Sequence, residues 1–234
     1  YLNNQEVLSN ISFVINPGES FAIVGPTGSG KTTITNLITK FYEINAGSIL
    51  IDGKDIDNYS LETVRSKIGI ILQDVFIFAD TIFNNITLFN ENITLEDVEN
   101  AAKELEIHEF ISSLPGGYSF NVSERGTTLS AGQKQLIAFL RVLVNNPDIL
   151  ILDEATSSID SYSEDLIKNA TKKITKDKTS IIIAHRLSTI ESADKIIYME
   201  NGKILESGNH KELLNISNGK FKKLYEEQFV DELV

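Results

Sequence analysis

Short apolar runs alternate with helix-like segments along most of the chain. Several runs contain only four or five apolar residues and end in polar ones, as in IGIILQD and DILILDE. Such runs are the length of strands rather than of buried helices. Because nearly continuous apolar strands that alternate with helices form parallel sheets, we expect an α/β fold with both sheet faces covered. The predicted strands are residues 11–15, 20–25, 47–53, 68–74, 148–154 and 179–185.

Helical spacing of apolar residues fills most of the remaining chain. In ITLEDVENAAKEL, Thr94 stands where an N-cap is expected and Asp97 lies in the first turn. Near the C-terminus, KIIYMENGKILESG reads as a hairpin that turns at Asn201-Gly202. The predicted helices run from Lys31 to about Phe41, over 93–105, 107–114, 130–144 and 161–174, and from about Lys211 and Lys220.

The pattern changes in the middle third of the chain. Residues 75–145 are mostly helical in spacing, whereas residues 1–74 and 146–234 carry the alternating strands and helices. We therefore expect a single domain in which an α-helical subdomain of residues 75–145 is inserted into an α/β core. A chain of 234 residues is long enough for such a core.

Composition and charge exclude several classes of function. Cysteine is absent, which excludes disulfides and thiolate metal sites. A net charge of −12 argues against a general affinity for nucleic acid or anionic lipid. No apolar run approaches the roughly 20 residues that span a bilayer. Because the chain begins with Tyr1 rather than Met, we expect a piece of a longer protein.

The segment GPTGSGKT, from Gly25 to Thr32, has the composition and position of a phosphate-binding loop. It fits the pattern of a glycine, four residues and then Gly-Lys-Ser/Thr, directly after a predicted strand and before a predicted helix. Glycines allow backbone N–H groups to surround phosphates, and the helix start adds partial positive charge. Lys31 adds a full charge, and Thr32 offers a hydroxyl to Mg²⁺.

Polar residues at the ends of other apolar strands predict the rest of a site. Asp153 and Glu154 follow ILIL, Gln73 follows IGIIL, and His185 follows SIIIA. Strand ends in parallel sheets meet at one edge, where ligands usually bind. A carboxylate there suits Mg²⁺, and a second one can polarise an attacking water, which favours hydrolysis over simple binding.

The whole chain resembles the nucleotide-binding domain of ATP-binding cassette (ABC) transporters of the exporter type. The resemblance implies a P-loop NTPase (RecA-like) α/β core, an N-terminal antiparallel β-subdomain and an inserted α-helical subdomain. This sequence has Ala131 where the family's usual Leu-Ser-Gly-Gly-Gln signature has its first glycine. The change should be tolerated if this residue keeps φ below zero. The matching motifs are GPTGSGKT (25–32, Walker A), Gln73, LSAGQ (129–133, signature), ILILDEAT (149–156, Walker B), SSID (157–160, D-loop) and His185 in IIIAHRLSTI.

By this resemblance, the chain is an ATPase that uses ATP and Mg²⁺. The implied catalytic residues are Glu154, His185, Gln73 and Lys31, and the implied Mg²⁺ ligands are Thr32, Gln73 and Asp153. The implied nucleotide contacts are Tyr1, Gly25, Pro26, Thr27, Gly28, Ser29, Gly30, Lys31, Thr32 and Thr33, together with Ser130, Ala131, Gly132 and Gln133, which act on the nucleotide of a partner.

The resemblance also implies partners and a location. A second domain of this kind, identical or different, would pair head to tail, and a transmembrane part would contact residues 75–86 and Ser123–Gly126 at the cytoplasmic face of a membrane. From sequence alone, the Phe-rich segment 75–86 could equally be core of the helical subdomain. Alternative classes are a soluble ABC ATPase of translation or repair, an importer subunit, and a cassette that binds ATP without hydrolysing it. The transported substrate stays open.

Overall fold

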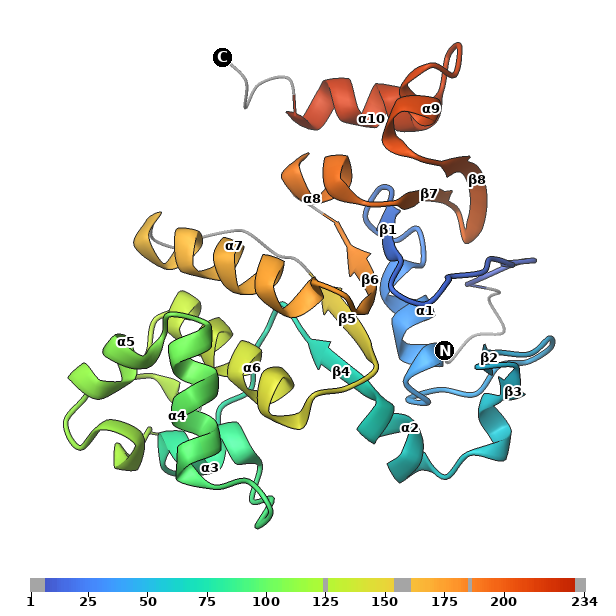
Figure 1. Cartoon of the computed structure of the whole chain (residues 1–234). Coiled ribbons are helices and arrows are strands. Elements are labelled where there is room, and N and C mark those ends of the chain that lie inside the picture. The colour runs from blue at the N-terminus through green and yellow to red at the C-terminus, as the bar shows by residue number, and fades with distance from the viewer. Residues whose placement is uncertain (1–6, 124–125, 154–160, 185–186, 230–234) are drawn as a thin grey trace.

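A six-stranded sheet forms the centre of the computed structural model, which describes residues 7–123, 126–153, 161–184 and 187–229 (Figure 1). The strand order is β4-β5-β6-β1-β7-β8, and only β8 runs antiparallel to its neighbour. The predicted mainly parallel sheet is thereby confirmed. The strands are β1 Ser20–Val24, β4 Ile68–Ile71, β5 Ile149–Asp153, β6 Thr179–Ile183, β7 Lys195–Glu200 and β8 Lys203–Gly208.

Strand β1 shows how the sheet joins two hydrophobic clusters. Because side chains alternate across a strand, Ala22 and Val24 face one cluster, while Phe21 and Ile23 face the other. All four are at most 1% exposed. The first cluster continues into the helical subdomain, and the second packs α1 (Lys31–Ile38) against the sheet. Both faces are therefore covered, as the sequence predicts.

A small antiparallel sheet lies beside the main one. Strands β2 (Leu50–Ile51) and β3 (Lys54–Asp55) pair across a turn in which Asp52 and Gly53 have φ of 52° and 76°. Two positive φ angles are the mark of a tight hairpin turn. The predicted strand at 47–53 thus becomes a two-residue strand and a turn.

The prediction of a strand at residues 11–15 is wrong. These residues alternate between half-buried and exposed, as a strand would, but they are not paired with any strand in the described part of the chain. The apolar alternation reflects packing of Ile11, Phe13 and Ile15 on the second cluster. Periodicity reports which side chains are buried, whereas a strand also needs a partner.

The predicted helices occur, with shorter neighbours that the sequence analysis missed. Helix α1 ends at Ile38 rather than near Phe41, because Lys40 has a left-handed φ of 53°. The missed helices are α2 Leu61–Lys67, α3 Ile82–Thr87 and α8 Leu187–Ser192, with short 3-10 turns at Ile56–Asn58 and Gly117–Ser119. The others are α4 Leu95–Glu104, α5 His108–Ser113, α6 Ala131–Asn145, α7 Ser161–Thr175, α9 His210–Leu214 and α10 Lys220–Phe229.

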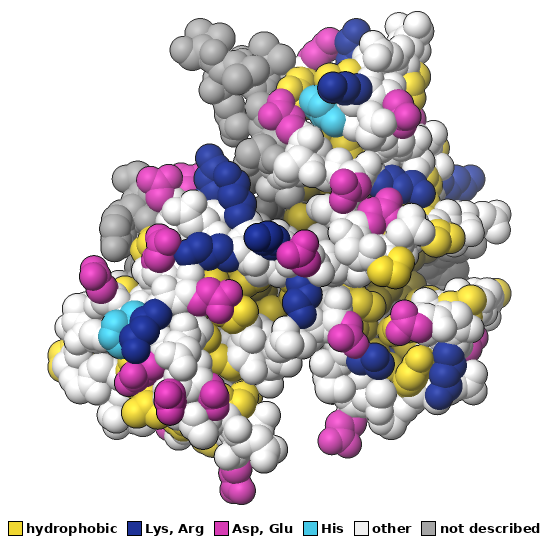
Figure 2. Space-filling model, viewed as in Figure 1, with side chains coloured by type: hydrophobic (Ala, Val, Ile, Leu, Met, Phe, Trp, Pro, Cys, Tyr) yellow, Lys and Arg dark blue, Asp and Glu magenta, His cyan; other side chains and the backbone are white. Residues whose placement is uncertain are grey.

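Helices α3 to α6 pack together to one side of the sheet, at the lower left of Figure 1. Acidic and basic side chains are interspersed over the face drawn in Figure 2. Within the described ranges, every helix is too short or too polar to cross a membrane.

Candidate functional site

The loop between β1 and α1 folds tightly around its glycines. Gly25, Gly28 and Gly30 have φ of 145°, 80° and 102°, a region that residues with a Cβ rarely adopt. A Cβ on Gly25 would overlap the Met199 carbonyl oxygen, and one on Gly30 would lie 2.6 Å from a methyl of Leu8. Packing against backbone therefore requires glycine at Gly25, whereas at Gly30 the left-handed φ is the main reason, because the Leu8 methyl belongs to a flexible side chain.

Lys31 lies under this loop with its ammonium group turned back onto it. The Nζ atom donates to the carbonyl oxygens of Gly25 at 2.7 Å and Pro26 at 3.0 Å, and the residue is 7% exposed. Burial lowers the pKa of Lys31 below its usual 10.5, and the negative charge of Asp153 partly opposes that shift. The buried Lys31 ammonium contacts two carbonyl oxygens and can bind an anion. A bound anion would raise the pKa of Lys31 back toward its usual value.

The start of α1 offers further groups to an anion. Its N-cap is Gly30, its first turn contains no acidic residue, and no side chain in the described part of the chain caps it. Within the described ranges, the Ser29 hydroxyl oxygen is buried without a hydrogen-bond partner. A phosphate would satisfy this hydroxyl and the unpaired N–H groups of the first turn together. The loop therefore offers groups of the kind that bind phosphate.

The strand ends bring two of the predicted polar residues to the same edge. Asp153 ends β5 and pairs in register with Ile183 of β6, the strand that lies between β5 and β1. Ile71 of β4 pairs with Leu152, so that the exposed Gln73 lies just beyond the level of Asp153. The effect of Asp153 on the Lys31 pKa places its charge close to the phosphate loop. Tyr1, Glu154 and His185 lie outside the described residues.

The signature segment forms the N-terminus of α6. Ser130 is the N-cap, Ala131 is the first helical residue, and Gly132 is buried. Ala131 thus has the negative φ that its methyl group requires. Figure 1 shows α6 apart from α1, with β4 and β5 between them in that view. Within one chain the structure therefore does not bring the α6 and α1 helices together.

The segment 75–86, predicted to be either core or docking groove, contains both buried and exposed apolar side chains. Ile77, Ile82 and Ile86 are fully buried, whereas Phe76 and Phe78 are 59% and 43% exposed. The two phenylalanine rings contact each other edge to face at 5.0 Å between centroids. The buried isoleucines thus belong to the core of the helical subdomain, and the aromatic pair lies at its surface.

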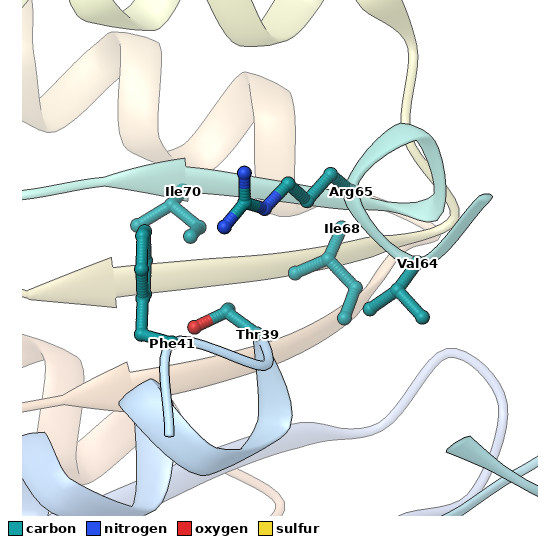
Figure 3. Close-up of a pocket in the computed structure, with 6 residues that line it drawn as sticks. All are labelled: Thr39, Phe41, Val64, Arg65, Ile68 and Ile70. Carbon is teal, nitrogen blue, oxygen red and sulfur yellow. The ribbon is translucent and has the colours of Figure 1, made fainter. Parts of the chain in front are cut away.

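A cavity that the sequence analysis did not predict lies beside the edge strand β4 (Figure 3). Its volume is about 250 Å³, and the Arg65 guanidinium lies 5.1 Å from the centre of the half-exposed Phe41 ring. The lining residues include none of the predicted nucleotide or metal ligands: they are Thr39, Phe41, Val64, Arg65, Ile68 and Ile70. A larger hollow of about 460 Å³ contains Asp153 together with Gln135 of α6.

Comparison with known proteins agrees with this geometry. A family model described as ABC transporter matches residues 8–157. The Bacillus subtilis (strain 168) protein YgaD, whose name describes a multidrug export ATP-binding/permease protein, is 47% identical over 223 residues. A Staphylococcus aureus (strain NCTC 8325 / PS 47) protein with the same descriptive name is also 47% identical. Both matches cover 95% of this chain and 38% of the relative.

A solved structure agrees as well. The structure of a bacterial Atm1-family ABC exporter with ATP bound superimposes with a TM-score of 0.87 and 40% sequence identity, over 100% of this chain and 40% of that one. The chain belongs to the ABC transporter family. It is an ATP-binding domain of that family, an ABC-type ATPase, with the α/β core, antiparallel β-sheet and helical subdomain that the sequence predicts.

Proposed function

We propose that this domain hydrolyses ATP to drive export of a substrate through a membrane part, at the cytoplasmic face of a membrane. The observation that carries the proposal is the buried Lys31, which lies under a glycine loop at the start of an uncapped helix. The names of the relatives, export ATP-binding/permease proteins, support it. This chain matches 38% of their length, which leaves the rest of each relative for the permease part.

The phosphates of ATP lie against the β1–α1 loop. Backbone N–H groups of Gly25 and of Thr27 to Thr33, together with the Lys31 ammonium, bind the phosphate oxygens, and the Ser29 hydroxyl is satisfied by the same ligand. Binding exchanges the carbonyl partners of Lys31 for phosphate oxygens, which raises the pKa that burial lowers. An aromatic stack of Tyr1 on adenine completes the site.

Three oxygen-bearing side chains fit a divalent cation at this edge. Thr32, Gln73 and Asp153 offer a hydroxyl, an amide oxygen and a carboxylate, which are the ligand types that Mg²⁺ accepts. When bound, Mg²⁺ neutralises charge on the phosphates. The exposed positions of Thr32 and Gln73 leave both side chains accessible to it.

Hydrolysis is an in-line attack of water on the γ-phosphorus. The water oxygen forms the new P–O bond while the bond to the β–γ bridging oxygen breaks, and ADP leaves with that oxygen. Glu154 orients or deprotonates the water, and the proton of the water leaves with the inorganic phosphate. His185 contacts the γ-phosphate, and Lys31 with the loop N–H groups stabilises the developing charge.

The signature segment acts on the nucleotide of a second domain of the same type, identical or different, which pairs head to tail. The Ser130 Oγ accepts the Gln133 N–H at 3.2 Å. Because a hydroxyl accepts and donates at the same time, it can also donate to a phosphate oxygen of the partner's ATP. The N–H groups of Ala131 and Gly132 at the start of a 15-residue helix add to this anion site.

The exposed aromatic pair Phe76–Phe78 and the segment Ser123–Gly126 contact the membrane part. Segment 120–122 lies beside 80–82, since Val122 N donates to the Asp80 carbonyl and Ile82 N to that of Phe120, both at 2.9 Å. One docking partner can therefore reach both segments.

The test compares ATP hydrolysis by the wild-type chain with that of Glu154→Gln. The variant should bind ATP within about twofold of wild type and hydrolyse it at least about 100-fold more slowly. A Glu91→Gln variant, on an exposed turn of the helical subdomain, serves as the control and should keep wild-type activity. Hydrolysis by Glu154→Gln at the wild-type rate would refute the catalytic assignment. A wild type that binds ATP without turnover at high protein concentration would indicate a regulatory cassette instead.

A further inference from the structure

One buried amide organises the loop that exposes the aromatic pair. Asn85 on α3 is 0% exposed, and its Oδ1 accepts the Phe78 N–H at 2.8 Å. Its Nδ2 donates to the carbonyl oxygens of Phe78 and Thr81, each at 3.0 Å. The backbone of 76–79 belongs to no helix or strand, so these bonds replace the partners that regular structure would supply.

Arg141 connects this loop to α6. Its Nε donates to the Asn85 carbonyl oxygen at 2.6 Å, Nη1 donates to the Phe76 carbonyl oxygen at 2.8 Å, and Nη2 donates to Asn85 Oδ1 at 3.1 Å. Burial lowers its pKa to about 10. Arg141 is half-buried, and losing its guanidinium would leave the Phe76 carbonyl and the Asn85 carbonyl and amide oxygens without these donors.

The same α6 helix contacts the second segment of the proposed membrane interface. A Cβ on Gly126 would lie 3.0 Å from Cβ of Ile77 and 3.1 Å from Cε of Lys134 on α6. The backbone after Phe120 pairs with the 80–82 segment, as described above. Hydrogen bonds and close packing thus connect the Phe76–Phe78 edge, residues 120–122, Gly126 and α6 in one network.

We propose that Arg141 and Asn85 are positioning residues that make segment 76–81 and α6 move as one body. Ser130 lies about three helical turns from Arg141 on the same helix. A displacement of the exposed Phe76–Phe78 edge therefore shifts the Ser130 end of α6, and engagement of Ser130 by a nucleotide restrains the edge in return. The inference rests on the proposed function, because it needs α6 to engage ATP.

The test uses hydrogen exchange of the chain in the Glu154→Gln background, which should retain ATP, with and without ATP and Mg²⁺. In this parent, ATP should slow exchange about fivefold or more in segments 130–136 and 76–81 alike. Arg141→Lys should keep the ATP-dependent slowing of exchange in 130–136 and lose that in 76–81, because one nitrogen atom replaces the three that Arg141 directs to Phe76 and Asn85. A purely structural role would change exchange equally with and without ATP, and leave the ATP-dependent difference intact.

A second variant tests the same connection independently, and a control variant removes an unrelated cation. Asn85→Ser keeps Arg141 but removes the amide that joins it to Phe78, and should lose the same response even if Arg141→Lys folds poorly. Lys173→Gln removes another cation that joins two segments, through bonds to the Glu104 carbonyl and the Glu106 carboxylate, and should change nothing.

Each outcome separates the inference from the proposed function. If ATP does not slow the exchange of residues 130–136 in the Glu154→Gln parent, α6 has no role in nucleotide binding, and the inference fails with it. If ATP slows exchange in residues 130–136 of the parent but not in residues 76–81, the inference alone is overturned. An Arg141→Lys chain that keeps the ATP response of 76–81 would overturn it too.

Discussion

Ser130 and Gln133 cap each other at the start of α6. Gln133 N donates to Ser130 Oγ at 3.2 Å, and Ser130 N donates to Gln133 Oε1 at 2.9 Å. This reciprocal pair is a capping box, and it holds the first turn of the helix in a defined position with its serine at the tip. In the monomer, Ser130 and Gln133 therefore stabilise the start of α6. Binding of a partner's ATP is a second task for Ser130.

The two tasks of Ser130 predict different results for two substitutions. Ser130→Asp keeps an N-cap acceptor and should retain stability, whereas Ser130→Ala should cost about 1 kcal/mol of unfolding free energy. Both should bind ATP normally as monomers, and Ser130→Asp should lose hydrolysis because its charge repels the partner's phosphate. Urea unfolding and steady-state hydrolysis measure the two effects. Wild-type turnover by Ser130→Asp would show that α6 does not contact the nucleotide.

Lys31 should set both the strength and the pH dependence of ATP binding. Lys31→Met should weaken binding about 10- to 100-fold, the range for a charged hydrogen bond. Lys40→Met, further along the chain and ion-paired to Asp57 at 3.1 Å, should leave binding unchanged. Equilibrium titration with a fluorescent ATP analogue measures both affinities.

The lowered pKa of Lys31 fixes the sign of the pH effect. In the folded chain the group deprotonates at lower pH than in the unfolded chain, where its pKa is 10.5. Burial of the charge therefore reduces stability below the folded pKa, and this cost is relieved as pH rises through it. ATP needs the charged form, so its affinity should fall as pH rises toward 10.5, and the Lys31→Met chain should lack that fall. An affinity independent of pH in wild type would contradict this.

Two glycines of the phosphate loop provide a matched pair. Both Gly25 and Gly28 have positive φ, but a Cβ on Gly28 meets nothing within 4 Å, while one on Gly25 overlaps the Met199 carbonyl oxygen. Gly28→Ala should therefore cost only the backbone strain, about 1–2 kcal/mol. Gly25→Ala must also displace the loop from β7, and should lower the thermal midpoint further and impair ATP binding. Equal effects of the two variants would mean that the contact with Met199 does not constrain the loop.

The capping box of α4 predicts an acid-sensitive contribution to stability. The Thr94 N–H and hydroxyl donate to Asp97 Oδ2 at 2.8 and 2.6 Å, and these bonds hold the pKa of Asp97 below 3.8. Their contribution is therefore present above pH 3.8 and is lost as pH falls through the folded pKa. Asp97→Asn should flatten the pH dependence of unfolding in that window. Glu96→Gln, exposed in the same turn, should not.

The sequence predicted the phosphate loop and the sheet because both depend on local patterns. GPTGSGKT encodes its own turn through its glycines, and the apolar strands encode their burial. The short helices α2 and α3 were missed, although Ser60 and Thr81 cap them by accepting from the N–H groups of Thr63 and Asn84. A polar cap before a six- or seven-residue helix leaves too few turns for periodicity to register.

Arg141 shows what a sequence pattern cannot supply. In LIAFLRVLV it looks like an isolated charge on a helix, and nothing nearby in the sequence indicates that its acceptors are Phe76 and Asn85. The strand predicted at 11–15 failed for a related reason, since its apolar alternation is real but no strand of the described residues pairs with it. Contacts between distant segments follow from packing of the whole chain.

A nucleotide site that is shared between two domains can be tested directly by mixing two inactive variants. Lys31→Met lacks a working phosphate loop, and Ser130→Arg lacks a working signature, so each alone should be inactive. In an equal mixture, half of the dimers pair one of each and hold one complete site, which predicts about a quarter of wild-type hydrolysis at the same total concentration. A mixture no more active than its components, while the wild-type chain turns over at that concentration, would contradict the shared site.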